Sequence, residues 1–161
     1  MRQILRRRES VDDPWRYPGE SAGEDEPRVL ACRELRDHAE KWLAGIAPVG
    51  VHLAPGDGVE DIAGYLPRLA LVTVEFPNFS DGRGFTHATL LRRHGFRGEL
   101  RAVGAGVKQD LLLLMARCGF DSFDLAPGQD PESALRALDR YSVAYQPAKP
   151  LEGVGRVRYG S

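Results

Sequence analysis

The sequence is poor in the side chains that bind metals. It holds two cysteines, Cys32 and Cys118, and four histidines among 161 residues. An iron–sulfur cluster takes about four thiolates, and a structural zinc site takes about four Cys or His ligands. One chain cannot supply the cluster, and the histidines show neither HxxxH nor CxxC-type spacing. We therefore expect no metal site, and two reduced thiols in a chain that carries no export signal.

An excess of charge and long apolar runs are also missing. Basic and acidic residues number 22 and 23, for a formal net charge of -1, so the composition predicts no attraction to nucleic acid or to an anionic membrane. The longest aliphatic block, Leu111–Ala116, is far shorter than the roughly 20 residues that span a bilayer. The basic first ten residues are not followed by an apolar stretch, so we expect no secretory signal and a cytoplasmic location.

Composition divides the chain into three parts. Residues 1–27 are rich in acidic residues, Gly and Pro, and we expect a partly disordered N-terminal arm that Trp15 and Tyr17 anchor on the domain. Residues 28–146 alternate between strand-like and helix-like patterns and form an α/β domain. Residues 147–161 are expected to form a C-terminal tail.

Within the domain, a strand–helix unit recurs about five times with short connections. Strand-like runs cover residues 28–32, 49–55, 69–76, 98–104 and 120–127, and helical patterns cover residues 34–45, 59–68, 85–95, 107–119 and 130–141. This alternation predicts a mainly parallel sheet with right-handed crossovers. The sequence leaves two arrangements open, an open doubly wound sheet and a partial (β/α) barrel.

The loop after the third strand is the first candidate site. Asp81, Gly82, Arg83 and Gly84 lie between a buried strand and the start of a helix. Glycines allow a ligand to approach the backbone closely, and free helix N–H groups together with an arginine favour an anion. The alternative is structural, because Asp81 can cap the helix and pair with Arg83.

The second candidate is a stripe of charged residues on two neighbouring strands. Glu75 shares a strand face with Thr73, and Glu99 shares one with Arg101. If the two strands are parallel neighbours, these side chains lead up to the DGRG loop. Charges on a strand that is covered on both faces are costly unless they are paired. The stripe is therefore either a structural ion pair or part of a site.

A second glycine loop follows the fourth strand. Gly104 and Gly106 precede a helix, and Asp124 lies about twenty residues on, which is part of the dinucleotide-binding pattern. Gln109 stands where the third glycine of that pattern belongs, so we expect no dinucleotide there. Gly104, Gln109 and Asp110 remain candidates for a second ligand loop at the carboxyl ends of the strands. No redox-cofactor motif is evident.

Several motifs together resemble a known bacterial family. They are FPNFSDGRG, GELRA, RCGFD and, near the start, DPW, and the resemblance covers roughly residues 28–148. The chain resembles the family known as bacterial domain of unknown function 934, whose members are typically encoded beside assimilatory sulfite reductase and are labelled oxidoreductases. The positions that match the family motif residue by residue are Asp81, Gly82, Arg83, Glu99 and Arg101.

The resemblance implies a cytoplasmic accessory role in reducing sulfite to sulfide, with sulfite reductase or its electron donor as partner. The chain departs from the family pattern at Ala105, Gln109 and Asp110. An alternative is a small enzyme that holds an anionic metabolite between Arg83 and Arg101. In that case Glu75, Glu99 or Asp81 would act as general acid or base.

Overall fold

The structure, a computed structural model, describes residues 2–78 and 80–144. The strands of this part are β1 (Gln3–Arg6), β2 (Glu9–Asp12), β3 (Arg28–Ala31), β4 (Val49–Leu53), β5 (Leu71–Glu75), β6 (Glu99–Val103) and β7 (Ser122–Phe123). The α-helices are α1 (Cys32–Leu43), α2 (Arg83–Arg93), α3 (Leu112–Arg117) and α4 (Pro131–Ala144). Three short 3₁₀ helices are η1 (Val59–Asp61), η2 (Ala63–Arg68) and η3 (Gln109–Leu111).

The seven strands form one sheet in the order β2-β1-β7-β6-β5-β4-β3. Strands β3 to β7 are parallel, while β1 pairs antiparallel with both β2 and β7. The prediction of an α/β fold with a mainly parallel sheet is confirmed. The parallel strands follow one another without the reversal of order that a doubly wound sheet requires, and the sheet does not close into a barrel.

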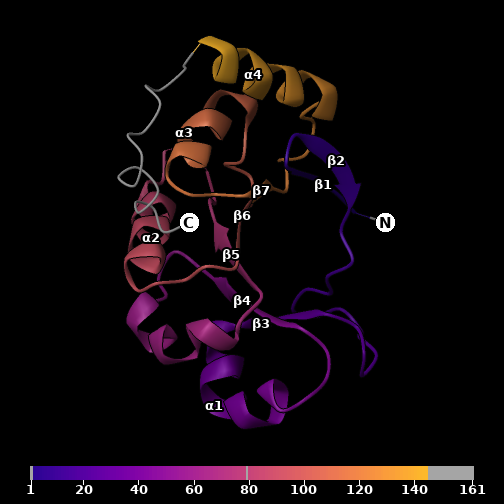
Figure 1. Cartoon of the computed structure of the whole chain (residues 1–161), viewed down its shortest axis with the longest axis vertical. Helices are drawn as coiled ribbons and strands as arrows, with labels where there is room; N and C mark the ends of the chain where they lie inside the picture. Colours follow the sequence, from indigo (N-terminus) through magenta and orange to yellow (C-terminus); the bar gives the residue numbers. More distant parts are fainter. Residues whose placement is uncertain (1, 79, 145–161) are drawn as a thin grey trace, which may run out of the picture.

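This strand order explains where the helices lie. Right-handed crossovers between successive neighbouring strands bring every helix to the same face of the sheet. Figure 1 shows α1, α2 and α3 along one side of the sheet, with the N-terminal segment on the other. The sheet therefore has an outer face under the helices and an inner face that the N-terminal segment crosses.

The main hydrophobic core lies between the helices and the outer face. Strand residues such as Val51, Val72 and Leu100 pack there against helix residues such as Leu35 and Leu91, and all five side chains are fully buried. Alternation along each strand sends every second side chain to this face. Most of the apolar burial that stabilises the fold thus belongs to one side of the sheet.

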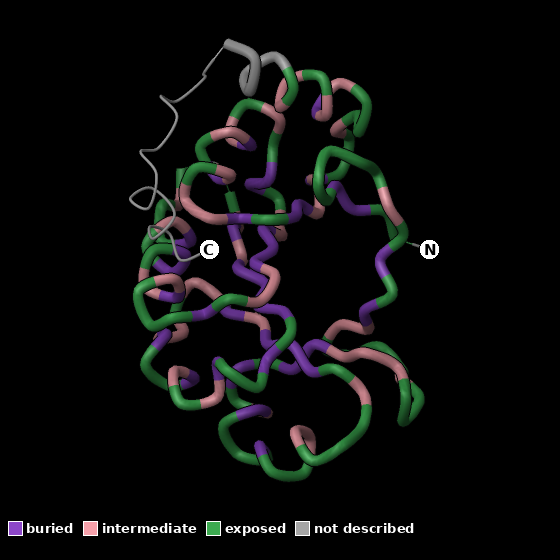
Figure 2. The backbone as a smooth tube through the Cα atoms, in the orientation of Figure 1, coloured by how far each residue is buried: buried purple, intermediate pink, exposed green. Residues whose placement is uncertain are grey.

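The N-terminal segment covers the inner face with a smaller apolar cluster. Trp15 packs there on Val29 and Leu71, with Tyr17 at the side. Gly50 lies beneath them, and a Cβ atom at this position would be 2.8 Å from the carbonyl oxygen of Leu71. Figure 2 shows that buried positions recur along this segment as they do along the strands.

The predicted N-terminal arm, described from residue 2 onward, is accordingly joined to the sheet, since β1 and β2 form a hairpin that extends it and Arg16 bridges to Arg28. The tail predicted for residues 147–161 lies outside the described residues. Within the described residues, no helix combines the length and apolar character needed to span a bilayer. The segment 59–68 forms two 3₁₀ helices instead of one helix, and Pro67 within η2 lacks the N–H that a longer α-helix would use.

Candidate functional site

A row of polar side chains crosses the inner face of the sheet. The strand register pairs His52 with Thr73, Thr73 with Arg101, and Arg101 with Ser122. Neighbours in register on parallel strands point to the same side, so these four residues form one line across β4 to β7. The neighbouring outer-face positions are apolar. The polar row is therefore the feature of the sheet that core packing does not explain.

Arg101 is the centre of this row and is fully buried. Its Nε donates to Ser122 Oγ at 2.9 Å, and its Nη1 donates to Asp13 Oδ1 at 3.0 Å and to the Tyr17 hydroxyl at 2.6 Å. Its Nη2 donates to Glu99 Oε2 at 2.6 Å. A guanidinium has five N–H donors, so the protein itself uses at least four of them.

Glu99 is held in its ionised form by this contact. Burial alone would raise its pKa, but the positive charge of Arg101 and hydrogen bonds from Ser122 and Arg101 bring the pKa below its ordinary value. Ser122 donates to Glu99 Oε2 at 2.6 Å, and Arg6 approaches Oε1 at 3.5 Å. The predicted shared face of Glu99 and Arg101 is confirmed, and their contact has the form of a buried structural ion pair.

Glu75 does not join this ion pair. Its Oε1 instead lies 3.0 Å from His52 Nε2, while His52 Nδ1 lies 2.8 Å from Thr73 Oγ1. The two side chains are partly exposed, at 23% for His52 and 34% for Glu75. A carboxylate beside an imidazole can exchange a proton with a bound molecule. Both residues lie near the carboxyl ends of their strands, the edge at which open α/β sheets bind ligands.

A further charged corner ties the start of the chain to β7. Arg2 lies 3.7 Å from Asp124, 3.9 Å from Asp13 and 3.4 Å from Glu20, and its guanidinium stacks on the ring of Tyr17 at 4.3 Å. Burial raises the pKa of the Asp124 carboxyl above its ordinary value, although Arg2 opposes the shift. Arg2 thus contacts Asp13 and Tyr17, the two residues of the N-terminal segment that bind Arg101.

The DGRG loop forms a self-contained turn at the start of α2. Asp81 accepts a hydrogen bond from the backbone N–H of Arg83 at 3.0 Å and a bond from Arg83 Nη2 at 2.6 Å. Hydrogen bonding from Arg83 lowers the pKa of Asp81 to about 2. The Arg83 side chain is nevertheless 61% exposed. Gly84 is needed for packing, because a Cβ atom there would be 2.5 Å from the ring of Phe76, while Gly82 has open space around it.

The structure does not bring the two predicted anion-binding arginines together. Arg101 is buried on the inner face, whereas Arg83 is exposed at the start of a helix that packs on the outer face. Among the described residues, the hydrogen-bond partner of the Arg83 guanidinium is Asp81, whereas the partners of Arg101 are Asp13, Tyr17, Glu99 and Ser122. An anion held by both would require Asp13 and Tyr17 to leave Arg101.

The second glycine loop serves the packing of two backbones. Gly104 has φ +110°, and a Cβ atom there would lie 2.5 Å from the carbonyl oxygen of Phe76. A Cβ atom on Gly106 would lie equally close, 2.5 Å, to the carbonyl oxygen of Asn78. Gln109 donates its backbone N–H to Gln129 Oε1 at 2.8 Å, and Asp110 is exposed. The glycines thus allow the loops after β5 and β6 to touch.

The thiols lie apart from the polar row. Cys32 and Cys118 are both free, and burial, followed by the nearby charges of Asp57 and Asp61, raises the pKa of Cys32 to about 11. Burial likewise raises the pKa of Cys118. Among the described residues, no group of three or more His, Cys, Asp or Glu side chains is placed to hold a metal ion.

Sequence reasoning missed three partners in the polar row. Asp13 and Ser122 bind Arg101, and His52 binds Glu75. The strand pattern VGVHL does signal His52, because it sends Val49, Val51 and Leu53 to one face and the histidine to the other. The signal for Asp13 is the DPW motif, whose Asp binds Arg101 and whose Trp covers the inner face.

Comparison with known proteins assigns the family. The model of a family described as bacterial protein of unknown function (DUF934) matches residues 50–152, well over half of the 161 residues. The chain belongs to the DUF934 family. The match includes Glu75, Glu99 and Arg101 together with the DGRG loop, whereas Asp13 and Tyr17 lie outside it. No curated protein matches the chain.

Proposed function

We propose that this DUF934 protein is a cytoplasmic accessory protein of assimilatory sulfite reduction. It supports sulfite reductase or the electron supply of that enzyme by docking to one of them. The sulfur-assimilation setting comes from the family resemblance of the FPNFSDGRG, GELRA and RCGFD motifs. The docking role rests on a difference between the two arginines: Arg101 is buried on the inner face, whereas Arg83 of the DGRG loop is exposed to solvent.

The observation that carries the docking role is the state of Arg83. Asp81 holds its guanidinium through Nε at 3.0 Å and Nη2 at 2.6 Å, yet 61% of the side chain faces solvent. An arginine that is oriented before binding loses little conformational freedom when a partner contacts it. Arginine is also enriched among the residues that dominate binding energy in protein interfaces. The DGRG loop is therefore the proposed contact with an acidic surface of the partner.

A gene deletion tests this proposal in the bacterium that encodes the chain. The deletion strain should fail to grow on sulfate or sulfite as sole sulfur source and should grow when sulfide or cysteine is supplied. The wild-type gene should restore growth, as should Arg93→Ala, which removes an exposed arginine from the other end of α2. Arg83→Ala should not restore it. Unimpaired growth of the deletion strain on sulfite would refute the proposal.

The partly exposed pair of His52 and Glu75 favours a second candidate, an enzyme that acts on an anionic metabolite. In this version Glu75 transfers the proton as general acid or base. Arg83 and Arg101 do not share the anion, because they lie on opposite faces of the sheet. Glu75→Gln should then abolish turnover of such a metabolite without a change in the unfolding midpoint. Equal turnover by the wild type and Glu75→Gln would remove Glu75 from the mechanism.

A further inference from the structure

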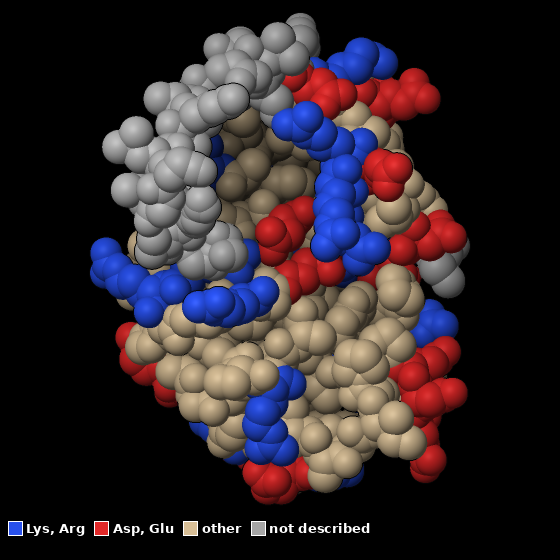
Figure 3. All heavy atoms as spheres, in the orientation of Figure 1, with Lys and Arg blue, Asp and Glu red and all other residues tan. Residues whose placement is uncertain are grey.

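A basic pocket opens at the edge of the sheet where β6 and β7 begin, opposite the edge that carries the DGRG loop. Its volume is about 440 Å³. Its lining residues are Arg6, Arg7, Arg97, Gly98, Glu99 and Asp121. Figure 3 shows Lys and Arg side chains on two sides of a hollow beside the β1–β2 hairpin, with acidic side chains at its edge. Known small-molecule sites have volumes of about 300–1,000 Å³, so this pocket has the size of a ligand site.

The two acidic groups of the pocket are already neutralised by arginines outside its lining. Glu99 accepts a hydrogen bond from Arg101 at 2.6 Å. Asp121 Oδ2 accepts one from Arg92 Nη2 at 2.9 Å and another from the backbone N–H of Leu100 at 2.9 Å. The charge of the pocket is therefore set by its three arginines.

Those three arginines have few acidic partners among the described residues. Arg6 makes one long contact with Glu99, at 3.5 Å, and its side chain is 44% exposed. Arg7 and Arg97 form no ion pair within residues 2–78 and 80–144. Three guanidinium groups around one recess repel one another unless a negative charge lies between them.

The backbone at the hairpin tip supplies an independent observation. Arg7 and Arg8 form the two-residue turn between Arg6 and Glu9, and their φ angles are +51° and +65°. Turns with two positive φ angles strongly favour Asn-Gly, because the Cβ atom of most L-residues crowds the backbone carbonyl in this conformation. Here the sequence places arginines in that conformation. Strained backbone that persists in a fold is concentrated at functional positions.

We propose that this pocket binds an oxyanion of the phosphate or sulfate type, either free or as the charged group of a larger molecule. The planar guanidinium matches two oxygens of such a group at once. Arg7 of the hairpin turn and Arg97 of the loop before β6 both contact the oxyanion. The site does not depend on the docking role of Arg83, because it lies at the other edge of the sheet.

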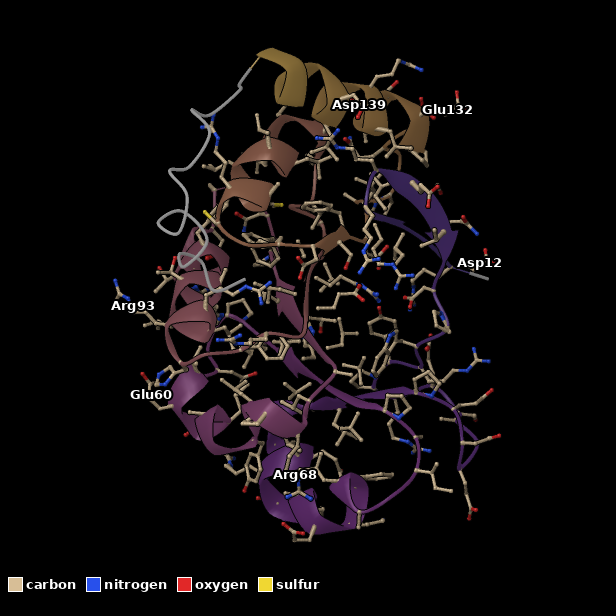
Figure 4. All side chains as sticks on the ribbon, in the orientation of Figure 1. Asp12, Glu60, Arg68, Arg93, Glu132 and Asp139 are labelled. Carbon is tan, nitrogen blue, oxygen red and sulfur yellow. The ribbon has the colours of Figure 1, made fainter. Side chains whose placement is uncertain are left out.

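Calorimetric titration of the full chain with inorganic phosphate, sulfate and sulfite tests the proposal, and adenosine 5′-monophosphate serves as the probe for a phosphate on a larger molecule. The key variants are Arg7→Asn and Arg97→Gln. Asparagine suits a positive φ angle, so Arg7→Asn should melt no lower than the wild type, and loss of binding cannot then be attributed to unfolding. The matched control is Arg93→Gln, which removes one charge from a side chain that projects outward from α2 at the left edge of Figure 4, away from the β1–β2 hairpin.

The wild type should bind at least one probe, and both pocket variants should weaken that binding at least tenfold while Arg93→Gln leaves it unchanged. Tighter binding of the nucleotide than of the inorganic ions would identify a group on a larger molecule, and equal binding would identify a free ion. The proposal is overturned if no probe binds, if the pocket variants bind as the wild type does, or if Arg93→Gln weakens binding equally. Growth of the deletion strain on sulfite bears on the docking role alone.

Discussion

Arg101 Nη1 lies 3.0 Å from Asp13 Oδ1, although the two residues are 88 positions apart and both side chains are fully buried. The Tyr17 hydroxyl accepts a hydrogen bond from the same nitrogen at 2.6 Å and donates one to Asp13 Oδ2 at 2.7 Å. The N-terminal segment is thereby fixed to the centre of the parallel sheet. We expect this contact to keep the N-terminal segment packed on the inner face of the sheet.

Removal of the Asp13 carboxylate should lower the free energy of unfolding substantially. Asp13→Ala leaves the buried charge of Arg101 with less compensation, and breaking such pairs costs about 3–5 kcal/mol. Urea denaturation measures the loss of unfolding free energy. Asp37→Ala is the control, since its partner Arg33 is 4.0 Å away in an exposed helix pair, and it should change stability by less than about 0.5 kcal/mol. Similar losses for both variants would contradict a locking role for Asp13.

Acid should weaken the fold through Glu99. The folded state lowers the pKa of this carboxyl below its ordinary value of 4.5, so the ionised group stabilises the fold above pH 4.5 and the stabilisation is lost as pH falls through the folded pKa. Unfolding free energies of the wild type and Glu99→Gln, measured from pH 7 downward, should therefore differ most at neutral pH and converge below pH 4.5. A difference that stays constant over this range would mean that Glu99 does not contribute through its charge.

Two glycine substitutions should show which glycine the packing of the loops requires. Gly104→Ala places a methyl group 2.5 Å from the Phe76 carbonyl oxygen at a φ of +110°, and overpacking and strain of this kind cost about 1–3 kcal/mol. Gly82→Ala meets nothing within 4 Å and has φ −85°, so its stability should equal that of the wild type or exceed it slightly. Thermal melts of the two variants compare them directly. Equal midpoints would argue against the close contact of the two loops.

Arg83→Ala should leave the fold intact. The side chain is largely exposed, and its guanidinium is bound by Asp81 within the same turn, so the unfolding midpoint should match that of the wild type. The variant should nonetheless lose the ability to restore growth on sulfite. A large drop in the midpoint would show that the DGRG loop is a structural element of α2 instead of a contact surface.

Much of the fold could be predicted from the sequence because local patterns determine it. The apolar run of β5 and the alternation in β6 predicted two strands, and the strand–helix alternation predicted that they run parallel; the structure adds that they are neighbours. The start of α4 is likewise local, because Asp130 caps the helix by accepting a hydrogen bond from the Ser133 N–H at 3.1 Å. The winding of the sheet was not decided by these patterns, because strand order depends on which segments meet in space.

The candidate site was predictable only where its partners are close in sequence. Glu99 and Arg101 share a strand, so alternation placed them together, and Asp81 and Arg83 share a turn. Asp13 comes from a segment whose composition predicted partial disorder, and its role depends on a contact over 88 residues. Local periodicity carries no information about such a distant pairing.

Affinity capture of the tagged chain from cells grown on sulfate is the most direct test of the proposed role. The account predicts that sulfite reductase or its electron donor is recovered with the wild type and with Gly82→Ala, and that it is lost with Arg83→Ala although that variant is folded. An absorbance spectrum of the eluate would show whether the captured partner carries a chromophore. Recovery of neither protein above the level of an untagged control would contradict the account.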